Sequence, residues 1–312
     1  MARTMSISNL SYLSVAVAIA TTTALPVAAQ SKPAAIDRSV GVLIVAHGGR
    51  ESWNSRVDSL AAAVRHGHVV TGPVGVSFLM GHRVPTHRFQ DEVAKLRKAG
   101  AQRVVVVPAL VSSSGGHYSE IRYLGGASDS LDATLMHHLH MSGLERPTGT
   151  QLTVTAALDD APELARTLAA RARAAVPSTR GRALFLFGHG PNSAEDYAAW
   201  MKRLRTVADS VKHATGFQSV VVELVRDDAP ADVRAEAVKR ARELITLQRQ
   251  ATHHDVVVVP ILISSGDVAK KLPADLVGLP IVYAAEPLLP DAHMARWVER
   301  RVVEAVAHGA KR

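Results

Sequence analysis

The chain has 312 residues, with 36 Lys and Arg against 28 Asp and Glu, which gives a net charge of +8. It contains no cysteine, and this excludes disulfides, thiolate metal sites and a lipid-modified N-terminal cysteine. The basic residues are scattered and aromatic residues make up only 4% of the chain, so no basic stripe with stacking side chains predicts nucleic-acid binding. The positive charge suits a small polyanion, such as a polycarboxylate.

The first thirty residues predict a cleavable secretory signal. One basic residue, Arg3, precedes an apolar stretch around Leu10–Ala20, and small residues lead up to Ala29. A membrane anchor is the weaker interpretation, because threonines and a proline interrupt an apolar run that is already too short to span a bilayer. We therefore expect residues 1–29 to be removed. The mature chain would begin near Gln30, be exported, most simply to a periplasm, and keep no membrane span.

Buried-type strands and amphipathic helices alternate along the rest of the chain. The apolar run "VGVLIVAHGG" (40–49) predicts a strand that ends in glycines, and "ESWNSRVDSLAAAVRH" (51–66) has helical spacing. We expect a strand, a helix and a strand next, then an irregular segment, then a last strand and helix, over residues 74–80, 86–98, 104–111, 152–157 and 161–176. Continuous apolar strands between helices indicate a parallel sheet covered on both faces.

The same pattern then restarts. "RALFLFGHGPNS" (182–193) repeats the first strand and aligns His189 with His47, and "VVVVPILISSGDVAKKL" (256–272) repeats "VVVVPALVSSSGGHYSEI" (104–121). Proline, serine, threonine and glycine cluster at the join, near 175–182. The sequence therefore predicts two tandem α/β domains of flavodoxin or Rossmann-like type, at 36–178 and 181–310, the second being a degenerate copy.

The two copies differ in one insertion. The first carries 24 residues more than the second between its Val-Pro strand and its last strand. This extra segment holds His117, Glu120 and the run "LMHHLHM" (135–141). The histidines and methionines of Met136–Met141 are suitable ligands for a soft metal, but Met and Leu at helical spacing are also typical of a core, and the sequence leaves the two interpretations open.

Two histidines are expected at the same rim of the first sheet. Ligands bind outside the carboxyl ends of parallel strands; His47 directly follows one strand, and His117 follows the tail of another. Two neutral imidazoles near a carboxylate suit Co, Ni, Fe or Zn better than Ca or Mg. A lone histidine after a strand can equally be a turn or capping residue, which is the alternative for His189. The glycines at 48–49 and 112–116 could bind phosphate through backbone N–H groups, but no nucleotide-binding motif occurs and we expect no nucleotide.

These residues resemble a known family. "LIVAHGGRESWN" followed by "GAQRVVVVPALVSSSGGHYSEI" resembles the class II tetrapyrrole chelatases, the sirohydrochlorin cobaltochelatase and ferrochelatase group. The resemblance implies paired chelatase-type domains around a cleft that holds the macrocycle. It also implies that His47 and His117 bind the metal and act in catalysis, and that Glu120 is the acidic residue that follows the second histidine.

The resemblance further implies a lyase of the kind used in cobalamin biosynthesis. Its substrates would be a tetrapyrrole polycarboxylate and a divalent ion, Co²⁺ first and Fe²⁺ or Ni²⁺ as alternatives. The chain departs from the family pattern in having Met80 in place of a glutamate, and Asp267 in the second copy in place of Gly-His. We expect the first copy to carry the metal chemistry and the second to complete the cleft. The competing hypothesis is an exported, non-enzymatic protein that binds and delivers a metal ion or a metallated tetrapyrrole.

Overall fold

The computed structural model describes residues 36–309, which belong to one compact unit. The predicted signal peptide lies outside the described residues. None of the helices within 36–309 is long and apolar enough to cross a membrane.

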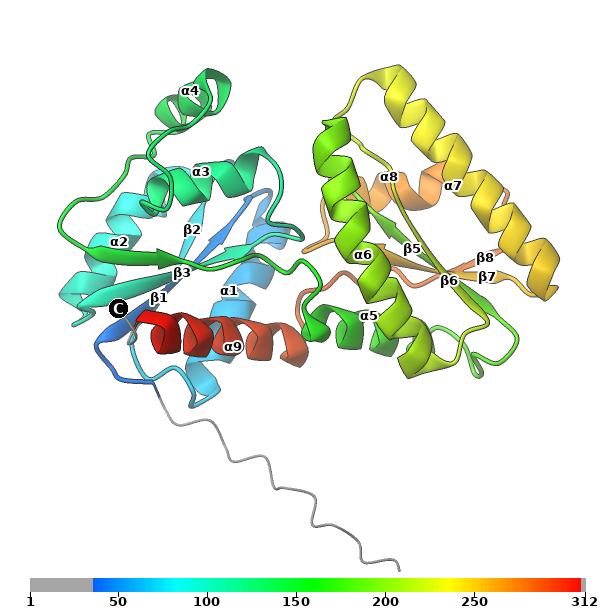
Figure 1. Cartoon of the computed structure of the whole chain (residues 1–312), viewed down its shortest axis with the longest axis horizontal. Coiled ribbons are helices and arrows are strands. Elements are labelled where there is room, and N and C mark those ends of the chain that lie inside the picture. Colours follow the sequence, from blue (N-terminus) through cyan, green and yellow to red (C-terminus); the bar gives the residue numbers. More distant parts are fainter. Residues whose placement is uncertain (1–35, 310–312) are drawn as a thin grey trace, which may run out of the picture. The chain divides into compact units, whose positions relative to one another are not determined.

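Within residues 36–309, eight strands form two parallel sheets with the same strand order (Figure 1). The first sheet has the order β2-β1-β3-β4 and the second the order β6-β5-β7-β8. The strands are β1 (Val40–Ala46), β2 (Val74–Phe78), β3 (Arg103–Ala109), β4 (Gln151–Val154), β5 (Ala183–Gly188), β6 (Ser219–Leu224), β7 (Val256–Ile261) and β8 (Ile281–Tyr283). The predicted fold class is confirmed: both copies are α/β units with parallel sheets covered by helices.

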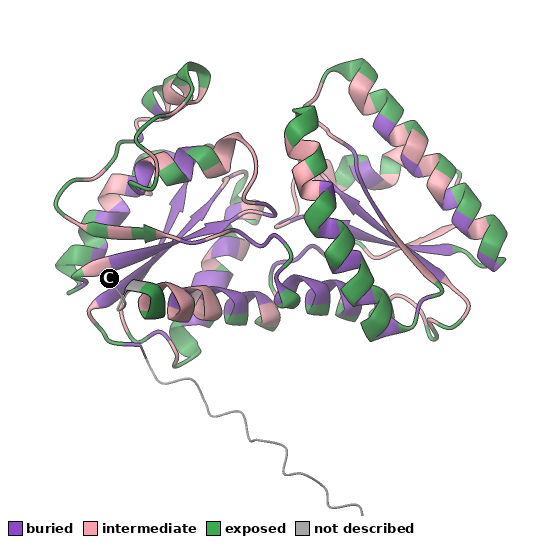
Figure 2. Cartoon of the chain, viewed as in Figure 1, coloured by how far each residue is buried: buried purple, intermediate pink, exposed green. Residues whose placement is uncertain are grey.

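The central strands form the core. All residues of β1, β5 and β7 are buried, and Figure 2 shows these central strands in the colour of buried residues. Strands β1 and β7 are rich in valine, whose β-branched side chain fits a pleated surface that is covered on both faces, and β5 has leucine and phenylalanine instead. Strand β1 pairs with β3 so that Ala46 lies beside Ala109, and β5 pairs with β7 so that Gly188 lies beside Ile261. The segments that follow these strands therefore start at the same rim of each sheet.

The helices match the predicted alternation, with one correction. They are α1 (Glu51–His66), the 3₁₀ turn η1 (Val84–Thr86), α2 (Phe89–Lys98), α3 (Gly116–Leu124), α4 (Ala133–Met141), α5 (Pro162–Ala174), α6 (Ala194–Thr215), α7 (Ala231–Thr252), α8 (Asp267–Asp275) and α9 (Ala292–Gly309). The segment expected to be irregular contains α3 and α4. Helix α4 is preceded by Asp132, whose carboxylate accepts hydrogen bonds from the backbone N–H groups of Thr134 and Leu135, as an N-cap does.

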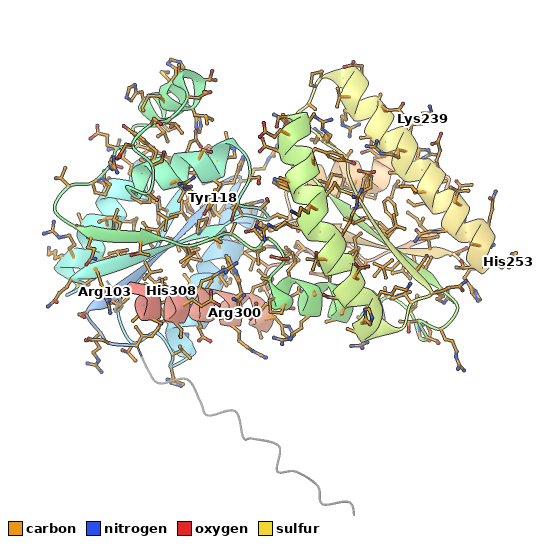
Figure 3. The ribbon with its side chains drawn as sticks, in the orientation of Figure 1. Arg103, Tyr118, Lys239, His253, Arg300 and His308 are labelled. Carbon is orange, nitrogen blue, oxygen red and sulfur yellow. The ribbon has the colours of Figure 1, made fainter. Side chains whose placement is uncertain are left out.

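The last helix of each copy packs against the other copy. Helix α9 contacts α1 and β3 of the first copy, whereas α5 contacts α6 and β7 of the second (Figure 1). The two exchanged helices also contact each other, and Arg300 of α9, labelled in Figure 3, donates two hydrogen bonds to the Glu163 carboxylate of α5. A single hydrophobic cluster consequently includes residues of both copies, among them Leu43, Leu186 and Trp297.

Candidate metal-binding site

His47 follows β1 directly and is held in one orientation. The sheet ladder continues past the strand, because the backbone N–H of Met80 donates to the His47 carbonyl over 2.9 Å. The Nδ1 atom of the His47 ring lies 2.7 Å from the carbonyl oxygen of Gly48. A carbonyl only accepts, so Nδ1 carries the proton and Nε2 keeps its lone pair. Burial, and then the neighbouring His117, lower the pKa of His47 to about 4, which leaves the imidazole neutral at pH 7.

The turn after His47 depends on two neighbours. Gly48 has a φ of +95°, and a Cβ added there would lie 2.0 Å from the carbonyl oxygen of Met80, so that only glycine fits. The side chain of Asn54, fully buried in α1, accepts from the Gly49 N–H over 2.9 Å and donates to the Gly49 carbonyl over 3.0 Å. Asn54 thus fixes the His-Gly-Gly turn. Asn54 was not predicted as a site residue, although it is the last residue of the motif "LIVAHGGRESWN".

His117 is brought next to His47. It lies in the first turn of α3, and the two ring centroids are 4.7 Å apart, edge to face. The Nδ1 atom of His117 lies 2.8 Å from Glu120 Oε2, one helical turn further on. A carboxylate accepts this hydrogen bond, and the Nε2 atom of His117 is then left as the ligand atom. The structure therefore brings together two imidazoles that both keep an Nε2 lone pair.

Glu120 lies behind His117, where its side chain is fully buried. Its second oxygen, Oε1, is 2.5 Å from the Nδ1 atom of His138 in α4. The rings of His117 and His138 have centroids 5.9 Å apart. Glu120 thus binds the Nδ1 side of two histidines at once, as carboxylates do when they orient metal-ligating imidazoles from behind. This placement favours a positioning role for Glu120 over direct contact with a substrate.

The serine-glycine loop between β3 and α3 is occupied by contacts of its own. Asp159 accepts hydrogen bonds from the backbone N–H and the hydroxyl of Ser113, at 2.8 and 2.7 Å. The N–H of Ser114 donates to the Ser112 hydroxyl, and the Ser114 carbonyl accepts from the Trp200 indole of α6 over 2.9 Å. Two N–H groups that could have bound phosphate are therefore already used. The loop holds His117 in place instead.

His189, the counterpart of His47, has both ring nitrogens engaged. Nδ1 lies 2.6 Å from the carbonyl of Gly190, and Nε2 lies 3.0 Å from Asp228 Oδ2. Two acceptors require two N–H donors, which only the imidazolium cation has. Burial opposes this charge, but the hydrogen bonds to Asp228 and Gly190 outweigh it and raise the pKa of His189 above its usual 6.5. His189 is therefore poorly suited to bind a metal.

Two further acidic residues of the second copy, Asp227 and Asp267, are also paired. The buried Asp227 carboxylate binds Arg234 and Lys271, at 2.9 and 2.7 Å. Asp267 is exposed and follows β7, as His117 follows β3 in the first copy. Its Oδ2 atom lies 3.5 Å from the Arg50 guanidinium of the first copy. Two groups in the described part of the chain bring potential ligand atoms within 4.8 Å of one another: His117 with Glu120 and His138, and His189 with Asp227 and Asp228. The hydrogen bonds leave free imidazole nitrogens only in the first.

The comparisons with known proteins concern the fold and the family of the first copy. Residues 41–175 match the model of the CbiX family. SirB from Bacillus subtilis, solved with Fe³⁺, is 15% identical over 88% of this chain and 98% of its own, with a TM-score of 0.63. DR2241 from Deinococcus radiodurans, described as a multi-domain protein with structural similarity to chelatases, is 18% identical over 87% of this chain and 55% of its own, with a TM-score of 0.52. No curated protein matches the chain. At such identities the two solved structures establish the fold, and the family match covers the copy that holds His47 and His117.

Proposed function

We propose that this chain, whose residues 41–175 match the model of the CbiX family, is a class II chelatase that inserts a divalent metal ion into sirohydrochlorin or a related tetrapyrrole. Co²⁺ is the first candidate, and Fe²⁺ and Ni²⁺ are the alternatives, because all three are borderline ions that imidazole binds well. The metal is a substrate and is not retained. The tetrapyrrole is a polycarboxylate, which the positive net charge of the chain would attract.

The pair formed by His47 and His117 is the observation that carries this proposal. Their rings are 4.7 Å apart at the carboxyl end of one sheet, and each has its Nδ1 atom bound to an oxygen acceptor. The two Nε2 atoms are then available to one ion. Two protein ligands leave the other coordination positions open for water and for incoming pyrrole nitrogens, which suits a metal that is handed on.

The reaction follows from these positions. His47 and His117 replace water on the ion and present it to one face of the macrocycle. As the metal enters, the two pyrrole N–H groups lose their protons, and the imidazole nitrogens that release the metal are free to accept them. Glu120 keeps its place behind His117 and maintains the ring orientation. Its role is therefore positioning.

The test is to incubate purified protein with sirohydrochlorin and with Co²⁺, Fe²⁺ or Ni²⁺ in turn, and to follow the absorbance change of the macrocycle against the spontaneous rate. We expect at least one metal to be inserted faster than without protein. The His47→Ala and His117→Ala variants should fall to the spontaneous rate. Wild-type protein that leaves the rate unchanged with every metal would overturn the proposal.

A non-enzymatic binding or delivery protein is the second candidate. The exposed histidines and methionine of α4 (His137, His140 and Met141) favour it, as does the predicted export signal. In that case the protein would bind metal or metallated tetrapyrrole in a fixed ratio and leave the insertion rate unchanged. The export that this candidate needs is tested by mass spectrometry of protein from the native host, which should find an N-terminus at or near Gln30. Intact Met1 would contradict export.

A further inference from the structure

Helix α4 is present only in the first copy and is attached to it by few contacts. It packs on α3, and among its residues only Leu139 is buried (Figure 1). His137, His140 and Met141 are exposed, and Met141 retains 75% of its accessible surface. A thioether and imidazoles that face water are not explained by core packing. The core interpretation of "LMHHLHM" therefore accounts for Leu139 and not for the other side chains.

His138 differs from its neighbours on α4 because it points to the proposed active site. Its Nδ1 atom donates to Glu120, the same buried carboxylate that orients His117. The Nε2 atom of His138 consequently keeps its lone pair, as does that of His117. The His138 side chain is 28% exposed, so its ring can be reached from solvent while it contacts the buried Glu120. The three rings of His138, His117 and His47 follow one another at centroid distances of 5.9 and 4.7 Å.

We propose that His138 is a third metal-binding imidazole of this chain, which takes up the divalent ion from solvent and passes it to His117 and His47. The inference rests on the proposed function and adds the route by which the metal substrate arrives. In each step the ion exchanges one ligand: His138 replaces a first water, His117 replaces a second water, and His47 then replaces His138. No redox change or further reactant is required.

The carboxylate shared by His117 and His138 allows this transfer. A single acceptor, Glu120, fixes the tautomer of both His117 and His138, so that both present the same ring nitrogen to the ion at the same time. The ion therefore moves between imidazoles without losing all its protein ligands. A structural role for His138 would require only the hydrogen bond to Glu120. Only the metal-binding role requires the Nε2 atom of His138.

The variant His138→Asn separates these roles. The amide nitrogen of asparagine takes the place of Nδ1 and can still donate to Glu120, but the variant has no counterpart of Nε2. His140→Ala is the matched control, since His140 is an exposed histidine of the same helix and His138, not His140, forms the hydrogen bond to Glu120. Thermal unfolding of all variants, compared with wild type, checks that α4 and the core stay folded.

The measurement is stopped-flow binding of Co²⁺ alone, without tetrapyrrole, followed by the visible absorption of the bound ion. We expect His138→Asn to slow Co²⁺ association about tenfold or more, with the final occupancy of the His47 and His117 pair little changed. His140→Ala should associate at the wild-type rate. Wild-type association by His138→Asn would overturn the proposal, as would equal slowing by His140→Ala. If loading depends on His138 but sirohydrochlorin is not metallated, the proposed function fails and the loading site stands.

Discussion

His47 and His189 occupy equivalent positions after β1 and β5, yet their Nε2 atoms meet different surroundings. Asp228 lies 3.0 Å from the Nε2 atom of His189, whereas the corresponding atom of His47 forms no hydrogen bond within the described structure. The pKa of His47 is lowered to about 4 by burial and by His117, and that of His189 is raised by Asp228 and Gly190 against the effect of burial. One strand end therefore presents a free imidazole nitrogen, and the other an ion pair.

These pKa shifts have opposite effects on stability. Between pH 6.5 and about 4 the unfolded chain protonates His47 while the folded chain does not, so the contribution of His47 to the free energy of unfolding falls as the pH falls. The contribution of His189 is complete below pH 6.5 and is lost as the pH rises through its raised pKa. In an NMR titration of the metal-free protein, we expect His47 to stay neutral at pH 5.5 and His189 to be protonated at pH 6.5.

The variant Asp228→Asn tests whether Asp228 causes the raised pKa of His189. Without the carboxylate, burial should dominate and the pKa of His189 should fall below its wild-type value. If the NMR titration of His189 is unchanged in Asp228→Asn, the ion pair does not set the protonation of this ring. An unshifted His47, titrating near pH 6.5, would equally contradict the assignment of a neutral ligand.

Metal affinity should depend on the histidines of the first copy and not on His189. His117→Ala removes a free Nε2 atom and should weaken Co²⁺ binding about 10- to 100-fold or more, whereas His189→Ala should leave it nearly unchanged. If His47 and His117 share one ion, the double variant should lose little more than either single variant. Isothermal titration with Co²⁺ provides the values. Loss of binding in a folded His189→Ala protein would place His189 among the ligands, and additive losses would assign His47 and His117 to separate sites.

At the scale of elements, the exchanged helices α5 and α9 join the two copies. Glu163 of α5 has a side chain only 6% exposed and accepts two hydrogen bonds from Arg300 of α9, at 2.9 and 2.8 Å. Burial would raise the pKa of Glu163, but Arg300 more than compensates and the pKa is lowered. The stabilisation from this carboxylate is therefore present above the ordinary pKa of glutamate and is lost as the pH falls through the lowered value.

We expect Glu163→Gln to lower the free energy of unfolding by about 1–3 kcal/mol, since the charged partner of Arg300 is lost. Glu304→Gln is the matched control, because Glu304 also binds Arg300 but is 41% exposed, and such surface pairs contribute about 0–1 kcal/mol. Urea unfolding at pH 7 gives both values. Equal effects of the two substitutions would show that the pair between α5 and α9 contributes no more than a surface ion pair.

The helices and strands could largely be predicted from the sequence, but the sheet against which each helix packs could not. A strand buried on both faces is a continuous apolar run, and such runs predicted the strands. A helix buried on one face has apolar residues at helical spacing, and this spacing predicted α1 over 51–66. Periodicity shows that α5 and α9 have an apolar face, but not which sheet covers it, and the exchange was therefore missed. Helix α4 lies in a segment that was expected to be irregular, because nine residues between polar loops leave only a short helical pattern. For the same reason His138 could not be separated from its neighbours until the fold placed it beside Glu120.

For the whole molecule, the exchange of α5 and α9 predicts that the two copies unfold together. Trp297 of α9 is fully buried in the cluster that includes residues of both sheets, although it belongs to the second copy in sequence. If one copy unfolds, the helix that it contributes no longer packs on the sheet of the other copy. Cooperative unfolding of this kind makes the slowest backbone amides of all core strands exchange with the same free energy.

Hydrogen exchange of β1 and β5 tests this prediction, with Trp297→Ala as the perturbation. Removing the indole leaves a cavity and should cost about 3–5 kcal/mol. Because α9 packs on α1 and β3 while α5 packs on α6 and β7, we expect the loss to appear equally in β1 of the first copy and in β5 of the second. Val303→Ala, at a partly buried position of the same helix, is the control and should give a smaller loss in both strands. If Trp297→Ala speeds exchange in β1 alone while β5 keeps its wild-type protection, the copies unfold independently, and the exchanged helices join two separate cooperative units.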